Sequence, residues 1–145
     1  MKPSPVTRFL SLLTTLGLLA GCSSTPPIHL AGIGGLSWQL VKYQGGNGAV
    51  RTPDDRTKYT VAFKNNGNLS VRFDCNRGTG DWILNGPNQL RFGPLDITRV
   101  VCPSGSWHDQ LVRQWPFIRT YVVKSGHLYL SLASDGGSYE FEPIP

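Results

Sequence analysis

The chain has 145 residues, a formal charge of +5, 17 glycines and 11 prolines. This length suits one domain and excludes two, and the wealth of glycine, proline and β-prone aromatic residues predicts short strands and frequent turns. The basic residues are scattered and form neither a stripe nor a known motif, so we expect no nucleic-acid partner.

The first 21 residues have the features of an export signal. Lys2 and Arg8 form a positive region, and the apolar residues 9–20 are too few to span a bilayer as a helix, which needs about 20 residues. Residues 19–22 (LAGC) resemble the lipobox of bacterial lipoproteins, in which cleavage precedes a cysteine that receives a diacylglycerol. The sequence therefore predicts a signal peptide over residues 1–21 and lipidation of Cys22.

The mature chain begins with a stretch that predicts a tether. Residues 22–35 are small, polar and rich in proline and glycine, which is typical of a flexible linker. Ser23 stands where an aspartate would resemble an inner-membrane retention signal. We therefore expect a domain over residues 36–145 that is held in the cell envelope, at the outer membrane and facing the periplasm. Its partners would be the membrane, through the lipid on Cys22, and an envelope protein of unknown identity.

Alternation of apolar and polar residues predicts strands through most of the domain. Residues 65–68 (NNGN), 125–126 (SG) and 135–137 (DGG) predict turns between them. Residues 82–84 and 90–92 are weaker strand candidates. The apolar positions that alternate are Trp38 and Leu40; Tyr59, Val61 and Phe63; Leu69, Val71 and Phe73; Leu128, Leu130 and Leu132; Tyr139 and Phe141.

One segment has helical spacing instead. Trp107, Leu111 and Trp115 recur at every fourth position, as on one helix face. Ser106 and Asp109 predict a capping box at its start, and Pro116 predicts its end. The predicted fold is mainly β (α+β): an antiparallel meander of about seven or eight strands, curled into a small barrel-like sheet and plugged or covered by one short α-helix.

Two blocks of sequence carry a family resemblance. Residues 74–82 (DCNRGTGDW) and 93–103 (GPLDITRVVCP) resemble, in that order, the two motifs of the META domain, the HslJ-like family of bacterial envelope proteins. The family motif residues here are Asn76, Gly80 and Thr98. The sequence departs from the pattern at Asp74, where the family usually has glycine, and at residues 100–101, where Val-Val replaces Met-Ala.

The resemblance extends over about residues 36–142. It implies a small β-rich domain without known catalysis, associated with heat-shock or envelope stress and with resistance to some antibiotics. We expect no catalytic residue, no metal and no cofactor. We interpret Asn76, Gly78 and Gly80 as turn residues, with an anion-binding nest beside Arg77 as the alternative.

Cys75 and Cys102 are the cysteines that remain once Cys22 is assigned to lipid. An even pair in an exported domain predicts a disulfide, with a free thiol pair or a nucleophile as alternatives. A thiol-hydrolase group of Cys102, His108 and Asp109 is disfavoured because adjacent helical residues point apart. A zinc site of both cysteines with His108 and His127 is disfavoured because no tight ligand spacing supports it.

These patterns favour a non-enzymatic envelope lipoprotein that binds or stabilises a partner under stress. The alternative is a protein inhibitor of a hydrolase, similar to the small β-barrel lipoproteins that block lysozymes. An inhibitor needs an exposed loop, for which residues 45–55 are the longest candidate. An enzyme needs paired acid and base groups in a pocket, and we expect both Glu140 and Glu142 to be solvated on one strand face.

Overall fold

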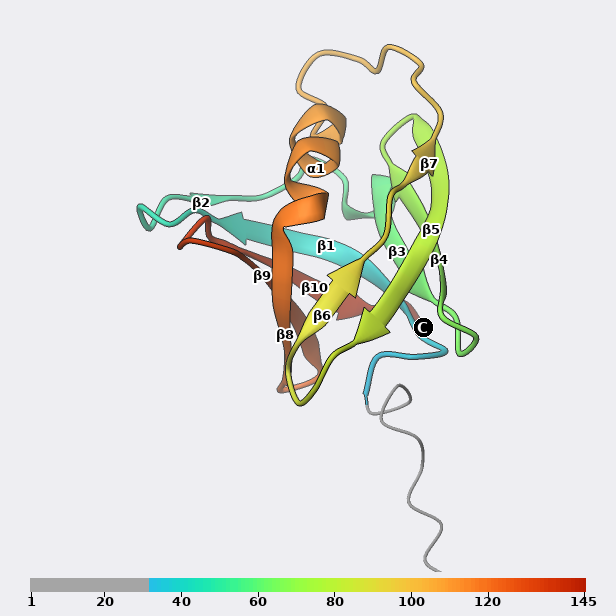
Figure 1. The fold of residues 1–145 in the computed structure, drawn as a ribbon. Helices are drawn as coiled ribbons and strands as arrows, with labels where there is room; N and C mark the ends of the chain where they lie inside the picture. Colours follow the sequence, from blue (N-terminus) through green and yellow to red (C-terminus); the bar gives the residue numbers. More distant parts are fainter. Residues whose placement is uncertain (1–31) are drawn as a thin grey trace, which may run out of the picture.

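An antiparallel ten-stranded sheet dominates residues 32–145, the part of the chain that the computed structural model describes (Figure 1). The predicted signal peptide and Cys22 lie outside these described residues. The strands are β1 (Ser37–Gln44), β2 (Val50–Arg51), β3 (Tyr59–Phe63), β4 (Asn68–Phe73), β5 (Asn76–Leu84), β6 (Leu90–Phe92), β7 (Asp96–Ile97), β8 (Ile118–Lys124), β9 (His127–Leu132) and β10 (Ser138–Pro143). The helices are α1 (His108–Gln114) and the 3₁₀ turns η2 (Arg56–Lys58) and η3 (Trp115–Phe117).

The sheet consists of two meanders joined through its first strand. Its order is β6-β5-β4-β3-β1-β10-β9-β8, with β2 paired to β1 and β7 paired to β5. The predicted hairpin turns are confirmed: Gly67 N donates to Lys64 O in one, and Ser125 and Gly126 adopt positive φ in another. The predicted mainly β, barrel-like fold with one short α-helix is therefore confirmed.

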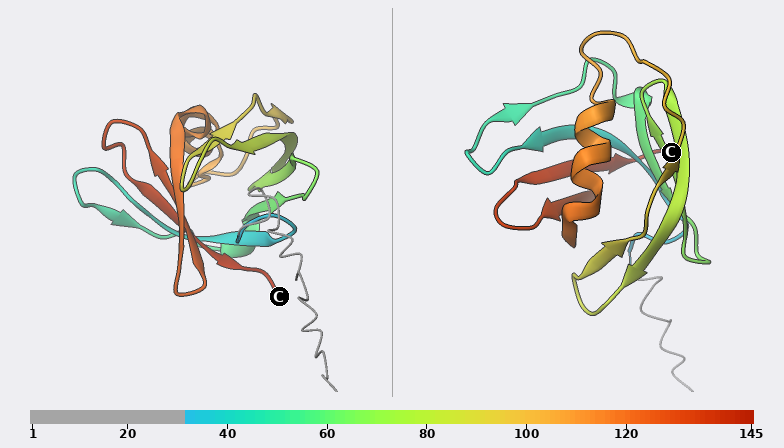
Figure 2. Two further views of the ribbon diagram at one scale, coloured as in Figure 1. Left: turned by 60° about the horizontal axis from the view of Figure 1, so that its bottom comes forward. Right: turned by 45° about the horizontal axis from the view of Figure 1, so that its top comes forward.

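The two outer strands of this sheet meet and partly close the barrel. Gln89, just before β6, forms a bridge with Thr120 of β8, and Tyr121 N donates to Asn88 O at 3.0 Å. Farther along, no described strand joins β8 to β7, which leaves an opening in the barrel wall. Helix α1 lies across this opening (Figure 2). The helix thus plugs the wider part of the barrel.

The alternating apolar residues fill the barrel, as their period predicts. The helix contributes Trp107, Leu111 and Trp115, which are all buried on the predicted face. Trp115 stacks on Phe92 with ring centroids 4.3 Å apart, so the helix and β6 share one aromatic cluster. Burial of each such large side chain contributes roughly 1.5–3 kcal/mol.

Two local predictions differ from the structure. Ile33 is fully buried, and Gly35 N donates to Phe63 O at 2.6 Å, so packed structure begins before residue 36, inside the stretch predicted as tether. The capping box is wrong: Ser106 Oγ accepts from His108 N at 3.2 Å, whereas Asp109 makes no side-chain cap bond. Trp107 occupies the N-cap position, so Ser106 lies one residue before it and is too far from the helix to form a reciprocal pair with Asp109.

Candidate functional site

A disulfide joins the end of one meander to the segment that enters the helix. Cys75 and Cys102 are bonded with their Cα atoms 5.5 Å apart, across 27 residues of sequence. This confirms the predicted pairing. Both sulfurs are thereby unavailable as a nucleophile or as zinc thiolates. Within residues 32–145, no group of histidine, cysteine and carboxylate side chains is arranged to hold a metal ion.

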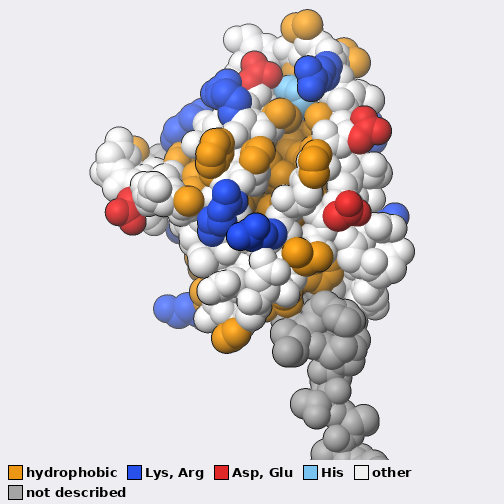
Figure 3. All heavy atoms as spheres, in the orientation of Figure 1, with side chains coloured by type: hydrophobic (Ala, Val, Ile, Leu, Met, Phe, Trp, Pro, Cys, Tyr) orange, Lys and Arg blue, Asp and Glu red, His pale blue; other side chains and the backbone are white. Residues whose placement is uncertain are grey.

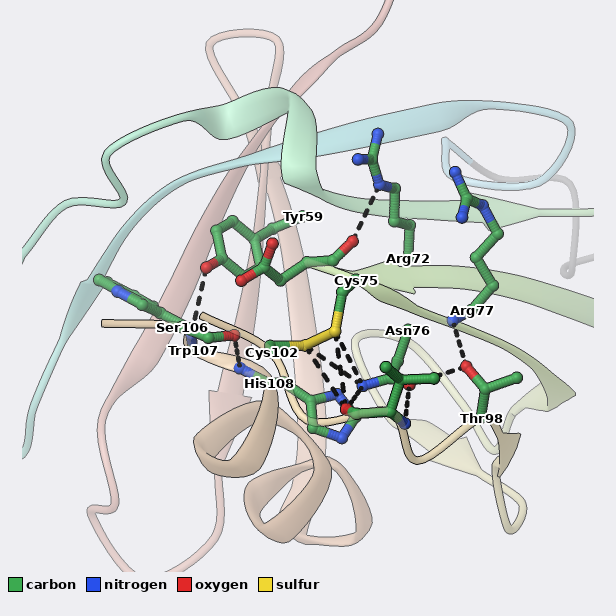
Figure 4. Close-up of a disulfide and its surroundings, with 12 residues drawn as sticks. Tyr59, Arg72, Cys75, Asn76, Arg77, Thr98, Cys102, Ser106, Trp107 and His108 are labelled. Carbon is green, nitrogen blue, oxygen red and sulfur yellow. Dashed lines mark hydrogen bonds between the residues drawn. A yellow bond between two sulfur atoms is a disulfide. The ribbon is translucent and has the colours of Figure 1, made fainter. Parts of the chain in front are cut away.

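Asn76 lies beside the disulfide and is completely buried. Its Nδ2 donates to Val100 O at 2.9 Å, and its Oδ1 accepts from Val100 N at 2.8 Å. The side-chain amide therefore satisfies both backbone groups of Val100, as a neighbouring strand would (Figure 4).

Thr98 completes the same network. Its Oγ1 donates to Asn76 Oδ1 at 2.8 Å and accepts from Arg77 N at 3.1 Å. Thr98 N in turn donates to Arg77 O at 3.0 Å. Asn76 and Thr98, two of the family motif residues, thus hold the chain that leads from β7 into the following loop.

Gly78 and Gly80 permit close approach of strands and do not form a turn. A Cβ on Gly78 would lie 2.8 Å from Ile97 Cβ, and one on Gly80 would lie 3.1 Å from Pro94 O. Both glycines belong to β5, so the prediction of a turn at residues 76–80, and the anion-binding nest built on it, is wrong. Glycine is needed at both positions because the segment that contains β7 packs directly against them.

The turn itself lies at residues 74–75, directly before β5. The φ of Asp74 is 60°, in the left-handed region that favours glycine. The departure from the expected glycine at this position thus falls where the backbone conformation favours glycine. Aspartate is tolerated because it enters this region more readily than most residues with a Cβ.

The loop between β7 and α1, residues 98–106, is called the apical loop below. It arches over the helix at the end of the barrel (Figure 1). Val101 has 94% of its surface exposed and Val100 has 62%. These two valines are presented to solvent by a backbone that the disulfide and Asn76 hold in place.

A pocket of about 560 Å³ lies between the apical loop and α1. His108 and Val112 of the helix, Ile97 of β7 and Arg99 of the loop contribute to its lining. Figure 3 shows hydrophobic side chains gathered in a hollow on this side of the molecule. The pocket thus combines apolar walls with a few polar groups, as ligand sites in proteins commonly do.

His108 is the residue whose role sequence reasoning missed. Its side chain is buried, and its Nδ1 has no hydrogen-bond partner among the described residues. Buried polar atoms are nearly always bonded, so each exception requires an explanation. A single histidine beside a tryptophan does not indicate in the sequence that its side chain is buried at the wall of a pocket.

The other candidate residues lie elsewhere. Residues 45–55 contain β2, and Arg51 Nη1 donates to Gln110 Oε1 at 2.7 Å, which attaches this loop to α1. His127 lies on β9, where its Nδ1 is 2.7 Å from Glu140 Oε1. Glu140 is buried and also pairs with Lys42, so the expectation that it is solvated is wrong.

Fold and site together define a small antiparallel β-barrel domain, plugged by one helix and stapled by one disulfide next to an exposed loop. The family model described as META domain matches residues 31–143. The chain belongs to the META domain family.

Two solved structures have a similar fold. A protein from Burkholderia xenovorans, determined by NMR, is 20% identical with a TM-score of 0.67, over 93% of this chain and 99% of that one. A DUF4847 family protein from Bacteroides vulgatus is 15% identical with a TM-score of 0.57, over 76% of this chain and 93% of that one. No curated protein sequence matches the chain. At sequence identities this low, the two comparisons establish a similar fold and nothing more.

Proposed function

We propose that this protein is a non-catalytic binding module whose apical loop recognises a partner protein in the cell envelope. The observation that carries the proposal is the 94% exposure of Val101 on a loop fixed by a disulfide. Exposed apolar side chains gathered in one place are typical of interaction surfaces. Here Val100 and Val101 are adjacent, beside a lined pocket.

Rigidity makes this loop suited to binding. A flexible loop loses conformational entropy when a partner orders it, at about 1–2 kcal/mol per residue for the backbone. The Cys75–Cys102 bond and the Asn76 amide restrict the loop before any partner arrives. A preordered loop therefore retains more of its contact free energy as affinity.

The proposed location rests on residues outside the described structure. The predicted lipid on Cys22 would hold the domain on a membrane, in our proposal the outer membrane facing the periplasm, because two or more acyl chains give stable anchoring. In residues 32–145, no helix is long and apolar enough to cross a bilayer. Intact-mass analysis of the mature protein tests the anchor. We expect an acylated chain that starts at Cys22 and is absent in Cys22→Ala, and an unacylated N-terminus at another residue would contradict it.

The binding role is tested by site-specific crosslinking in intact cells. A photoreactive residue at position 101 should give a discrete adduct of one protein partner. The matched control is position 123, because Val123 is also a valine, is 40% exposed and lies on β8. The same adduct from both positions, or none from position 101, would contradict the proposal.

The alternative function, inhibition of a hydrolase such as lysozyme, stays a prediction. The loop we assigned to it, residues 45–55, extends away from the barrel at β2 and exposes Val50 to 57% (Figure 1). A titration of lysozyme activity with the purified protein tests it. Loss of activity at stoichiometric protein, relieved by Val50→Asp, would favour inhibition, and unchanged activity would dismiss it for this enzyme.

A further inference from the structure

We propose that the outer edge of β7 accepts an extended peptide strand from the partner, which would lie in the groove between β7 and α1. This inference rests on the proposed function and deepens it, because it names the chemistry of what the site binds. Addition of a strand to a sheet edge is a general mode of peptide recognition.

The register shows that β7 has an unpaired edge. Thr98 N bonds to Arg77 O, and Asp96 is paired with Thr79 of β5. In an antiparallel pair, backbone groups alternate in direction, so Asp96 and Thr98 face β5. Ile97 and Arg99 therefore direct their N–H and C=O groups away from β5. Among the described strands, β5 is the partner of β7 and no other strand covers this edge.

The far side of this edge is the pocket. Ile97 and Arg99 contribute to its lining from β7 and the apical loop, and Val112 and His108 contribute from α1. Its volume of about 560 Å³ lies within the range of roughly 300–1,000 Å³ that ligand sites occupy. An added strand would thus place its backbone against β7 and one face against Val112 and His108 of α1.

His108 supplies a directed polar contact. A neutral imidazole carries one proton, on either Nδ1 or Nε2. Its Nδ1 is buried without a hydrogen-bond partner among the described residues, so the ring brings an unsatisfied polar atom, a donor or an acceptor according to the tautomer, to the pocket that it lines.

Arg99 adds a charged donor group at the same pocket. A guanidinium carries five N–H donors and no acceptor, so it favours a ligand that brings acceptors, such as peptide carbonyls or a carboxylate. Asp109 also lines the pocket, as a carboxylate, and disfavours a second acidic group next to it. The chemistry that fits is an extended, mainly apolar peptide segment with one acidic residue or a terminal carboxylate.

The test uses peptides selected from a random nonapeptide phage library on the mature lipidated protein in detergent micelles. A selected peptide is then resynthesised with one backbone N-methyl group at each position in turn. Strand pairing predicts losses of affinity of at least tenfold at every second residue, since alternate residues of the added strand bond to β7. NMR shift changes should be largest at the Ile97 and Arg99 amides.

Two variants at one position separate backbone from side-chain effects. Arg99→Pro removes an edge N–H without removing a bond to β5, whereas Arg99→Ala keeps that N–H. We expect Arg99→Pro to weaken the peptide at least tenfold more than Arg99→Ala does. The N-methyl series keeps the test decisive if the proline variant misfolds.

The outcomes distinguish this inference from the proposed function. Peptide binding without a period-two pattern, shift changes centred on another strand, or no enrichment of any peptide would each overturn strand addition at β7. Crosslinking from position 101 would be unaffected by those results, because it reports contact with the apical loop alone. Failure of crosslinking together with period-two peptide binding would overturn the loop proposal and leave strand addition in place.

Discussion

The side-chain amide of Asn76 bonds to both backbone groups of Val100, with donor–acceptor distances of 2.9 and 2.8 Å. One buried side chain thereby replaces a strand partner for the apical loop. The disulfide attaches the same loop two residues further on, at Cys102. In this chain Asn76 therefore has a structural role, which is to hold the exposed apical loop in place.

Loss of the Asn76 amide should destabilise the protein strongly. Asn76→Ala removes the bonds to Val100 and to Thr98 and leaves their polar groups without a partner in a partly buried place, where each unsatisfied group costs about 1–3 kcal/mol. We expect the free energy of unfolding to fall by about 3 kcal/mol in urea denaturation.

Asn66→Ala is the matched control for this substitution. Asn66 Oδ1 accepts from Asn68 N in an exposed turn, so the loss should be about 0.5 kcal/mol. An equal loss of unfolding free energy in the two variants would show that Asn76 does not stabilise the apical loop more than an exposed turn residue stabilises its turn.

Removal of the disulfide should cost a comparable amount. The bond closes a segment with a sequence separation of 27, which corresponds to roughly 3–4 kcal/mol in the chain-entropy model. The variant Cys75→Ala/Cys102→Ala should unfold at a correspondingly lower urea concentration. A double variant as stable as the wild type, or two alkylatable thiols in unreduced wild-type protein, would be incompatible with a structural bond.

Asp74 offers a test of backbone strain. Because its φ is 60°, Asp74→Gly should be at least as stable as the wild type, and Asp74→Ala should be less stable than Asp74→Gly by about 1 kcal/mol. Thermal unfolding of the three proteins measures the order. An alanine variant as stable as the glycine variant would mean that position 74 is not held in this conformation.

Glu140 should give the domain an acid-sensitive component. Burial acts to raise the pKa of Glu140, but hydrogen bonds from His127 and Lys42 outweigh it and hold the pKa below its ordinary value of 4.5. The folded state thus binds this proton less readily than the unfolded state. The stabilisation is present above the ordinary pKa and is lost as pH falls through the lowered one.

Denaturation of the wild type and of Glu140→Gln at a series of pH values measures this contribution. We expect the wild type to lose more stability than the variant between about pH 5 and pH 3. If the free energy of unfolding fell equally with pH in both proteins, Glu140 would not contribute to the acid sensitivity.

The sequence predicted the elements whose side chains follow a regular period. Trp107, Leu111 and Trp115 indicated the helix, and alternating apolar positions such as Leu69 and Val71 indicated the strands. The disulfide followed from cysteine number and compartment. The helix, the strands and the disulfide could be predicted because each depends on local residue spacing or on composition.

The features that the sequence did not predict depend on contacts between distant segments. Gly78 and Gly80 have the composition of a turn, and only the approach of β7 explains why they lie in a strand. The role of Asn76 requires Val100, which is 24 residues away. Ile33 lies in a proline- and glycine-rich stretch, and its burial depends on the barrel it packs against.

In our proposal the disulfide preorders the apical loop for a partner. The affinity of the partner captured at position 101 for wild-type protein and for Cys75→Ala/Cys102→Ala, both held under conditions where circular dichroism shows them folded, tests it most directly. We expect a Kd at least tenfold higher for the double variant, because about 1.4 kcal/mol or more of loop ordering must then accompany binding. Equal Kd values in the two folded proteins would contradict it.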